Sequence, residues 1–494
     1  MALNSSQPHF VLMPFMCQGH LIPMIDIARL LAERNVIVTI ITTPQNAARC
    51  STSIKRAIES GLAFRVLQVR FPAAEVGLPE GCETFDSLPS MHLRSNFYAA
   101  VSWLQQPVEK MFEELKPQPS CIIYDRNFTW IAEIASKFQI PRFSFDGKNC
   151  FFLLCYHNLT TSKVHECISE GEAFVVPGLN DRIEFTAAQL PGNLNPGSSS
   201  NMNELIKKMM EVEKGANGLI VNSFEELEAE YVESYQKVRK QKLWCVGPVS
   251  LCNKENFDKA QRGNEALTDE NQCLKWLDSW PRSSVIYVCF GSLNRLTPPQ
   301  LIELGLALEA SNRPFIWVIR GANKKEEMEK WLAEDGFEER LKGRGLLIRG
   351  WAPQVLILSH PSIGGFLTHC GWNSTLEGIS AGVPMLTWPM FADQFMNEKL
   401  LVQILKVGVR VGVAVSVQMG EEESAVLVKR EDVKKAVESL MDEGEEGEER
   451  RKRARELAKM AKKAVEEGGS SYLNITLLIE DIMLQATATS PALA

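Results

Sequence analysis

A histidine lies at the start of a predicted helix, directly behind a predicted buried strand. His20 follows the apolar run His9–Pro14 and opens the apolar helical pattern Leu21–Ala32, with Pro23 in the first turn, where proline is allowed. An imidazole has the right base strength to take a proton from a hydroxyl group while that hydroxyl attacks a substrate. The alternative is an ordinary surface or capping histidine. His20 is therefore a candidate general base at the carboxyl end of a strand.

Such a base needs a carboxylate behind it, which fixes the tautomer and stabilises the imidazolium that forms. Asp125 is the candidate because it follows a second predicted strand, Cys121–Tyr124. The carboxyl ends of parallel strands lie at one edge of a sheet, so we expect Asp125 and His20 to meet there. For Asp125 alone, the alternative is a helix cap.

The richest set of polar and aromatic residues is the block Trp351–Gln394, which is 44 residues long. Within it, Gly365–Thr368 is typical of a strand end, and a glycine-containing turn leads to a helix that we expect to open at Ser374. A helix start offers free N–H donors and the positive end of the helix dipole, which bind phosphate without a basic patch. His369 and Asn373 add side-chain donors. The block therefore predicts a diphosphate site.

Structural alternatives stay open inside this block. Ser374 and Glu377 have the spacing of a capping box, in which both side chains only satisfy the helix start. Trp351 stands before Ala352-Pro353-Gln354, and it is either a core residue or a flat surface on which a uracil ring stacks.

The elements that must position these residues are short apolar runs that alternate with longer helical patterns. Near-continuous Val, Ile and Leu runs suit strands buried on both faces, and their alternation with helices predicts right-handed βαβ units and parallel sheets. Two sets of strands predict two doubly wound α/β domains with a ligand cleft at the strand ends. The expected strands are His9–Pro14, Val36–Thr42, Phe64–Val69, Cys121–Tyr124, Arg142–Phe145 and Gly218–Val221 in the first set, and Ser284–Phe290, Pro314–Ile319, Gly345–Ile348, Gly365–Thr368 and Pro384–Trp388 in the second.

A chain of 494 residues is too long for one ordinary core, which favours two domains. Leu190–Asn201 is predicted to be a loop inside the first domain. The predicted parts are an N-terminal domain at 1–249, a polar surface linker at 250–272, a C-terminal domain at 273–470, and a C-terminal helix and tail at 471–494.

Composition argues against several other classes of protein. A formal net charge of −8 offers no basic face for nucleic acid or anionic lipid. The chain shows no long apolar run and no basic N-terminal region, so we expect neither a membrane span nor a signal peptide, and a cytoplasmic protein. The twelve cysteines are scattered singly, which indicates reduced thiols. No Asp-x-Asp occurs, so no metal is expected on the diphosphate.

The block resembles, position for position, the signature of the plant secondary-product glycosyltransferases, family 1 of the glycosyltransferases. The stretches Phe15–His20, Gly77–Cys82 and Val246–Val249 are similar to the members that act on flavonoids, triterpenoids and steroids. The resemblance covers nearly the whole chain. It implies the GT-B fold, in which two Rossmann-like domains face each other across a cleft and the last helix crosses back onto the first domain.

The resemblance also implies a role for each matching residue. His20 matches the catalytic base of the family, and Asp125, with Trp130 five residues on, matches its orienting acid. The family usually has Ala at Cys17 and Ser at Cys289; we expect both changes to be tolerated, with Cys17 affecting acceptor preference. The implied donor residues are Trp351, Ala352, Gln354 and Glu377 for uracil and ribose, Ser292, His369, Asn373 and Ser374 for the diphosphate, and Trp372, Asp393 and Gln394 for the sugar.

Together these features predict a monomeric enzyme that transfers glucose from UDP-glucose to a hydroxyl of a small lipophilic flavonoid-, triterpenoid- or steroid-like acceptor. The resemblance associates Gln394 with glucose users, whereas His at that position goes with galactose users. Direct displacement by an activated hydroxyl inverts the sugar, so an α-linked donor gives a β-glucoside. Candidate residues for an apolar acceptor pocket are Phe15, Met16, Met91, Phe128, Phe151 and Phe391.

Other functions remain as alternatives. A non-catalytic nucleotide-sugar binder would share the fold, and the same base can serve transfer to carbon, nitrogen or sulfur. A dinucleotide oxidoreductase would need a Gly-x-Gly-x-x-Gly turn after a strand, and none is present. A membrane-bound glucuronosyltransferase would need a signal peptide and a spanning helix.

Overall fold

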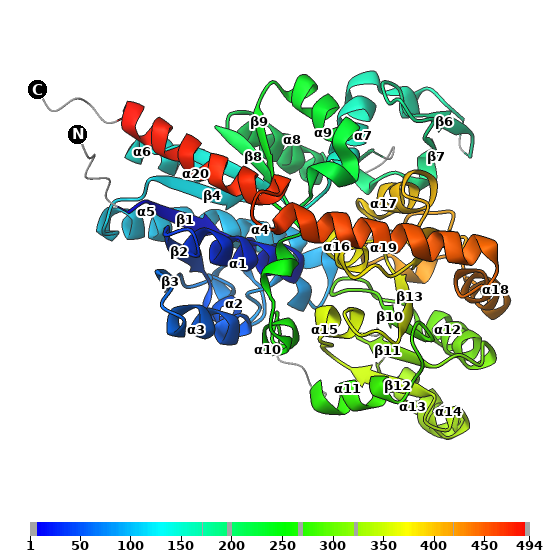
Figure 1. Ribbon diagram of the computed structural model, residues 1–494. Helices are drawn as coiled ribbons and strands as arrows, with labels where there is room; N and C mark the ends of the chain where they lie inside the picture. The colour runs from blue at the N-terminus through cyan, green and yellow to red at the C-terminus, as the bar shows by residue number, and fades with distance from the viewer. Residues whose placement is uncertain are drawn as a thin grey trace, which may run out of the picture.

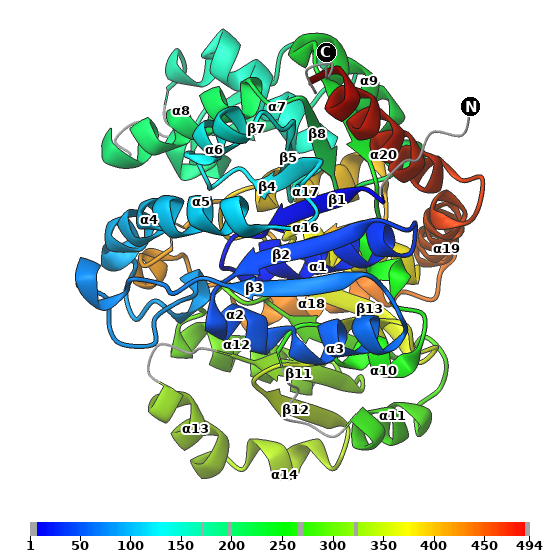
Figure 2. The same ribbon diagram turned by 90° about the vertical axis from the view of Figure 1, so that its left-hand side faces the viewer.

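Two parallel sheets dominate the computed structural model, which describes residues 7–169, 171–194, 200–264, 270–320, 325–417 and 419–489. The first has the strand order β3-β2-β1-β4-β5-β8-β9, and the second has the order β12-β11-β10-β13-β14-β15. Figure 1 shows the two sheets in separate halves of the molecule, with helices packed around each, and Figure 2 shows the first sheet above β11 and β12. This is the predicted GT-B architecture.

The strands of the first sheet are β1 His9–Met13, β2 Ile37–Thr42, β3 Phe64–Gln68, β4 Cys121–Asp125, β5 Arg142–Asp146, β8 Gly218–Val221 and β9 Lys242–Cys245. Those of the second are β10 Val285–Cys289, β11 Phe315–Ile319, β12 Gly345–Arg349, β13 Ile363–Thr368, β14 Met385–Thr387 and β15 Gly408–Arg410. A small hairpin consists of β6 Ala173–Val175 and β7 Glu184–Thr186.

The helices that come before the second sheet are α1 Gln18–Ala32, α2 Pro44–Arg49, α3 Ser51–Glu59, α4 Arg94–Trp103, α5 Gln105–Glu114, α6 Ile131–Phe138, α7 Cys150–Ser162, α8 Ser200–Lys214, α9 Glu225–Arg239, α10 Asn256–Ala260 and α11 Glu270–Asp278. The remaining helices are α12 Pro298–Ala310, α13 Lys325–Glu334, α14 Phe337–Leu341, α15 Gln354–Leu358, α16 Trp372–Ala381, α17 Gln394–Lys399, α18 Arg430–Leu440, α19 Glu445–Val465 and α20 Ser470–Thr489.

Every strand expected from an apolar run is present, within two residues at either end. The central strands β1, β4, β10 and β13 are buried along their whole length, which explains their continuous apolar sequence. The sequence analysis missed β9, β15 and the hairpin of β6 and β7. These strands have only three or four residues, too few for a clear periodic pattern.

The strand order reverses between β1 and β4 in the first sheet and between β10 and β13 in the second. In both places the neighbouring strands are parallel, with Met13 opposite Tyr124 and Cys289 opposite Thr368, and the pairing of β10 with β13 shifts register between Val285 and Ile286. Ligands of doubly wound sheets bind outside the carboxyl ends of the strands at such reversals. The loops after these four strands are therefore where a site is expected.

The two halves share a continuous hydrophobic core beneath the cleft. One cluster runs from α7 and α9 through α17 to β10 and β13, with Phe151 and Leu154 on one side and Phe395 and Phe366 on the other. This packing fixes the two sheets relative to each other.

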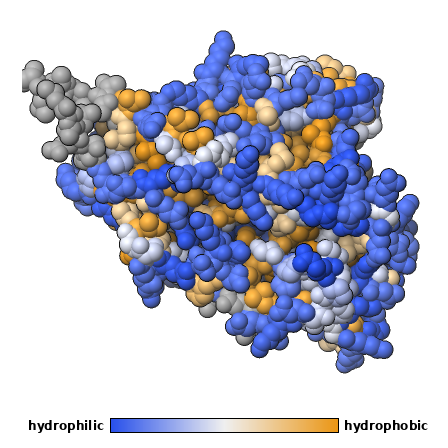
Figure 3. All heavy atoms as spheres, in the orientation of Figure 1, coloured by the Kyte–Doolittle hydropathy of each residue, from blue (hydrophilic) through white to orange (hydrophobic). Residues whose placement is uncertain are grey.

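The two C-terminal helices connect both halves. α19 packs against α16 and α9, and α20 packs along β9 and α9 of the first sheet. Figure 1 shows α20 running back over the first half. The face they form is mostly hydrophilic, with hydrophobic residues showing in separate groups (Figure 3).

The domain boundaries stay a prediction, but two of the segments expected to be loops contain regular structure. The polar stretch 250–272 includes α10, and Asp258 in it is buried. Leu190–Asn201 contains a 3₁₀ turn at Gly192–Leu194 and the start of α8, while 195–199 lie outside the described residues.

Candidate active site

His20 and Asp125 meet at the reversal of the first sheet. His20 is the third residue of α1, and Asp125 is the last residue of β4. The Nδ1 atom of His20 lies 2.6 Å from Oδ2 of Asp125. The His20 side chain is 29% exposed, whereas the Asp125 side chain is fully buried behind it. Distant residues of the chain thus form one pair because their strands are neighbours.

The surroundings of Asp125 keep it ionised. Burial alone would raise its pKa, but His20 and two hydrogen bonds from Asn127 outweigh that effect and hold the pKa below its usual value. The Asn127 backbone N–H and Nδ2 both donate to Oδ1, at 3.0 and 2.6 Å. An ionised carboxylate only accepts hydrogen bonds, so Nδ1 of His20 donates to it, which in the neutral imidazole leaves the lone pair on Nε2.

The turn between β13 and α16 encloses His369. A Cβ at Gly371 would lie 2.2 Å from Nε2 of His369, and one at Gly291, after β10, would lie 2.6 Å from Cε1. Burial lowers the pKa of His369 to about 4. The imidazole is therefore neutral near pH 7 and brings no positive charge to the site.

The helix after this turn starts earlier than expected. α16 begins at Trp372 with Gly371 as its N-cap, whereas the sequence analysis placed the start at Ser374. The indole Nε1 of Trp372 donates to the backbone oxygen of Asn222 at 2.7 Å, so the first residue of the helix contacts the first half of the molecule. Ser374 and Glu377 therefore do not form the capping box that the spacing allowed.

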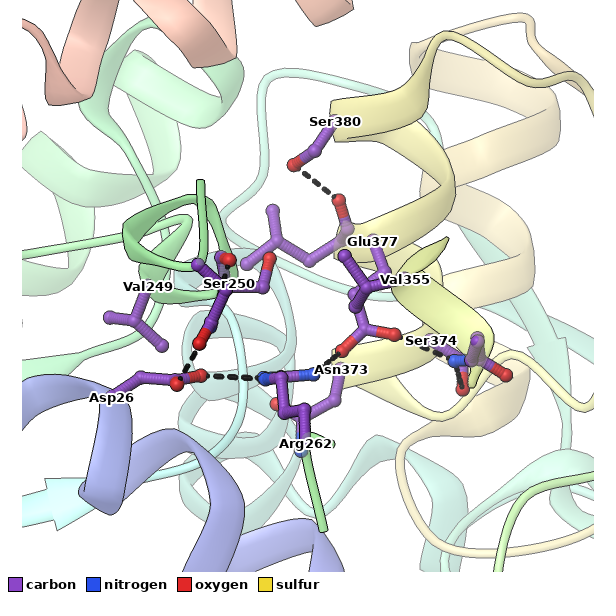
Figure 4. A network of polar contacts seen from close by, with 12 residues as sticks. Asp26, Val249, Ser250, Arg262, Val355, Asn373, Ser374, Glu377 and Ser380 are labelled. Carbon is purple, nitrogen blue, oxygen red and sulfur yellow. Dashed lines mark hydrogen bonds and ion pairs between the residues drawn. The ribbon is translucent and has the colours of Figure 1, made fainter. Parts of the chain in front are cut away.

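Ser374 and Glu377 instead belong to a polar network at the cavity. Nε2 of Gln354 donates to Oε2 of Glu377 at 2.7 Å and to Oγ of Ser374 at 3.1 Å. The other carboxylate oxygen of Glu377 accepts from Arg262, as Figure 4 shows. The side chains of Ser374 and Glu377 thus bond to Gln354 and Arg262, and not to the backbone at the start of the helix.

Trp351 lies at the end of the cavity that contains this network. The guanidinium carbon of Arg320 stands 4.5 Å from the centre of the Trp351 ring, so the indole already packs against one planar group. Ala352 is buried beside it. Trp351 lines the cavity, which is not the position of a pure core residue.

Asn373 joins the donor turn to the helix that carries His20. Its Nδ2 donates to the backbone oxygen of Gly19 at 2.7 Å. Asn373, which is expected to bind a diphosphate, therefore contacts Gly19, the residue directly before the candidate base His20.

The residues expected to face the sugar are held from behind. Oε1 of Gln394 accepts from the backbone N–H groups of Met390 and Phe391, at 2.8 and 3.1 Å. Oδ2 of Asp393 accepts from Nδ2 of Asn397 at 2.6 Å. Asp393 is the N-cap residue of α17, but its side chain makes no cap hydrogen bond.

A cavity of about 520 Å³ brings the predicted site residues together. His20 and all eleven residues assigned to the donor line it, while Asp125 is buried behind His20. Phe15, Phe85 and Tyr98 form an aromatic wall, in which the Phe15 ring stacks on Tyr98 with 5.9 Å between the ring centres. Of the other aromatic and methionine candidates, Phe391 lines the cavity and Met91 lines a smaller neighbouring pocket. The other three candidates, Met16, Phe128 and Phe151, are buried in the hydrophobic core.

Several contributors were missed from the sequence. Arg262 lies in the stretch expected to be a surface linker, and nothing in its sequence context signals a buried role. Asn397 follows Asp393 by four residues on a helix, a spacing that brings side chains together and offered a usable signal. Asn222 directly follows β8, and its backbone oxygen accepts from the Trp372 indole.

Two negative results concern the described residues only. In that part of the chain, no group of three His, Cys, Asp or Glu side chains is arranged to hold a metal ion. No helix there is both long and apolar enough to span a bilayer.

Two doubly wound domains, a helix start facing the cleft and a histidine–aspartate pair opposite it define a class: the nucleotide-sugar-dependent glycosyltransferases of GT-B fold. The family described as UDP-glucoronosyl and UDP-glucosyl transferase matches residues 257–449. The family described as glycosyltransferase, N-terminal domain, matches residues 7–251.

Curated relatives and solved structures agree with this class. UDP-glycosyltransferase 73C12 of Barbarea vulgaris is 57% identical over 486 residues, which cover 98% of both chains. UDP-glycosyltransferase 73C5 of Arabidopsis thaliana is 55% identical over 483 residues, 97% of both. UGT73P12 of Glycyrrhiza uralensis, complexed with glycyrrhetinic acid 3-O-monoglucuronide, has a TM-score of 0.92 at 39% identity, covering 98% of this chain and 97% of that one.

The chain belongs to the plant family 1 UDP-glycosyltransferases, as the block Trp351–Gln394 predicted. It is accordingly a glycosyltransferase that uses a UDP-sugar donor and a small-molecule acceptor.

Proposed function

We propose that the protein transfers glucose from UDP-glucose to a hydroxyl of a small lipophilic acceptor and inverts the sugar to give a β-glucoside. The observation that carries this proposal is the His20–Asp125 pair, with 2.6 Å between Nδ1 and Oδ2, beside the cavity that the donor residues share. Nε2 of His20 takes the acceptor proton while the acceptor oxygen attacks the anomeric carbon. The bond from that carbon to the diphosphate breaks on the opposite face, and Asp125 stabilises the imidazolium.

Uncharged hydrogen-bond donors stabilise the negative charge that develops on the departing diphosphate. The first turn of α16, with its free N–H groups, lines the cavity, and Ser374, Asn373 and Ser292 add side-chain donors. His369, whose low pKa keeps it neutral, lies beside them without adding a positive charge. Such donors stabilise developing charge without a basic patch.

The sugar is read by Asp393 and Gln394. Because Oε1 of Gln394 is engaged by two backbone N–H groups, its Nε2 is the group available to donate to a sugar hydroxyl. Asp393 shares one oxygen with Asn397 and retains lone pairs for two hydroxyls. This donor–acceptor pair suits the equatorial hydroxyls of glucose.

The acceptor lies against the aromatic wall of Phe15, Phe85 and Tyr98, beside His20. The Phe15 ring also contacts the His20 imidazole edge-to-face, with 5.6 Å between centres. An apolar wall next to the base favours flat or polycyclic molecules. The similar Glycyrrhiza uralensis enzyme is complexed with glycyrrhetinic acid 3-O-monoglucuronide, which supports a triterpenoid- or steroid-like acceptor.

The test combines donor competition with one matched pair of variants. We expect kcat/KM for UDP-glucose to exceed that for UDP-galactose and UDP-glucuronate by at least about tenfold, since one or two buried hydrogen bonds are lost with the wrong sugar. We expect His20→Ala to lower kcat on a simple phenol by ~10²–10⁴-fold with little change in the Kd of UDP. His92→Ala, an exposed histidine outside the cavity, is the control.

Each outcome separates one part of the proposal. Equal use of glucose and galactose would show that Gln394 does not read the sugar. Near-normal turnover of His20→Ala would remove His20 as the base. UDP binding without UDP release on any phenol or sapogenin would favour a non-catalytic binder, and an α-linked product would contradict inversion.

A further inference from the structure

The connection between the two sheets passes through the donor half of the cavity. Arg262 lies between α10 and α11, and its side chain is only 9% exposed. Its Nε and Nη2 lie 2.8 Å from Oδ2 of Asp26 on α1, and its Nη1 donates to Oε1 of Glu377 on α16. Figure 4 shows the guanidinium between these two carboxylates. One side chain of the connection therefore joins both halves of the molecule.

The backbone of Arg262 and the next residue, Gly263, also contact the residues that line this part of the cavity. Nε1 of Trp351 donates to the Arg262 backbone oxygen at 3.3 Å. Gly263 has a φ of +98°, and a Cβ there would lie 2.4 Å from Cζ2 of Trp351 and 2.8 Å from Cδ1 of Ile22. Only glycine satisfies both the backbone conformation and this close packing. The segment is thus a wall of the nucleotide site.

The following residue contacts the helix that carries the candidate base. Oδ1 of Asn264 accepts from Nε2 of Gln18 at 2.7 Å, two residues before His20. The three consecutive residues Arg262, Gly263 and Asn264 therefore contact both the nucleotide end of the cavity and the start of α1.

The carboxylate of Glu377 still has room for a ligand. Its Oε1 accepts from Arg262 and its Oε2 accepts from Gln354, so each oxygen uses one of its two lone-pair sites. Arg262 holds one oxygen of Glu377 through Nη1 and Gln354 holds the other, so the two contacts together limit the rotation of this carboxylate. Glu377 therefore presents one free lone pair on each oxygen in a fixed direction.

The bridge is not needed merely to attach α1 to the connection. Arg29 on α1 already pairs with Asp258 of α10, with 3.2 Å between Nη1 and Oδ2, and Arg56 on α3 pairs with the same carboxylate at 2.7 Å. What distinguishes Arg262 is its contact with Glu377.

We propose that Arg262 is a positioning residue of the nucleotide site, which orients Glu377 to accept the ribose hydroxyls and couples that contact through Asp26 to the helix of the catalytic base. This inference rests on the proposed role of Glu377 in binding the ribose. It assigns a donor-site function to the connection between the two domains.

The test compares the Kd of UDP with that of 2′-deoxy-UDP by titration calorimetry, without any acceptor. In the parent protein we expect UDP to bind at least about tenfold more tightly, the worth of one charge-assisted hydrogen bond. Arg262→Gln should reduce this ratio at least threefold, because Glu377 loses its fixed orientation. Arg262→Lys keeps a charge but not the fork, and should give an intermediate ratio.

The ratio is insensitive to partial unfolding, because both ligands are measured on the same preparation. Arg29→Gln is the matched control: it removes a guanidinium between α1 and the connection without touching Glu377, and the ratio should not change. If Arg262→Gln does not fold, Arg262→Lys supplies the same readout.

Failure of this inference differs from failure of the proposed ribose contact. If Glu377→Gln lowers the ratio and no Arg262 variant does, Arg262 only stabilises the fold and the inference is overturned. If Glu377→Gln leaves the ratio unchanged, the ribose role of Glu377 is wrong, and the inference falls with it while the His20 mechanism is untouched.

Discussion

His20 and His369 are two imidazoles in one cavity with opposite surroundings. His20 is partly exposed and has an ionised carboxylate behind it, so its far nitrogen is available as a base. His369 is enclosed by the glycine turns after β10 and β13, and burial lowers its pKa to about 4. The same side chain is thus a partly exposed imidazole backed by a carboxylate in one place and an enclosed, neutral imidazole in the other.

The low pKa of His369 predicts an acid sensitivity of the fold. Between pH 6.5 and 4 the unfolded chain protonates this residue and the folded protein does not, so the free energy of unfolding falls as the pH falls. The gap between 6.5 and about 4 corresponds to at most about 3 kcal/mol. Urea titrations at pH 7 and pH 4.5 should show a smaller loss in His369→Asn than in the parent protein. An equal loss in both would show that the imidazole titrates freely.

At the scale of elements, the proposed donor site depends on a turn in which one residue, Gly371, has no side chain. Gly371 has a φ of −61° and a ψ of 139°, which any residue can adopt, so its lack of a side chain is required by His369 and not by backbone strain. The turn therefore places the imidazole and the start of α16 together.

Gly371→Ala should weaken nucleotide binding while α16 still forms. The added methyl group would sit 2.2 Å from Nε2 of His369 and must displace it. We expect the Kd of UDP to rise by about tenfold or more, the loss of one or two buried hydrogen bonds. In a His369→Ala background the same change should add little, because the clash is gone. A full additional loss there would mean that the turn itself, and not the imidazole, is disturbed.

At the scale of the whole molecule, the last helix closes the first sheet. Ile475, Leu478 and Ile482 of α20 are buried in the core cluster of β1, β4 and β5, while Leu477 on the opposite side is 52% exposed. Lys242 at the start of β9 also pairs with Asp481. α20 therefore stabilises the half that carries His20.

Neighbouring leucines of α20 allow a controlled test of this docking. Leu478→Ala should lower the free energy of unfolding by about 2–5 kcal/mol, because it leaves a cavity in the core. Leu477→Ala removes the same atoms from an exposed position and should cost less than about 1 kcal/mol. Chemical denaturation measures both. Equal effects would mean that α20 is not docked as described.

The sequence by itself determined the two parallel sheets and the family. Short continuous apolar runs such as His9–Pro14, alternating with helical patterns, suit strands buried on both faces, and their boundaries were predicted closely. The 44-residue block fixed the family because it specifies many polar and aromatic positions at once. His20 and Asp125 were found because strand ends of a parallel sheet share one edge.

Tertiary structure decided whatever depends on contacts between distant segments. α16 starts at Trp372, whose indole bonds to Asn222, about 150 residues earlier, a contact that no local pattern reveals. Phe128 and Phe151 are buried in the core and do not line the cavity, because packing, and not residue type, determines which aromatic side chains line it. Arg262 resembles a residue of a solvated linker until Asp26 and Glu377 are brought to either side of it. The local sequence predicts which segments form strands and helices and where they begin and end, whereas the contact partners of a residue are set by how the two halves pack.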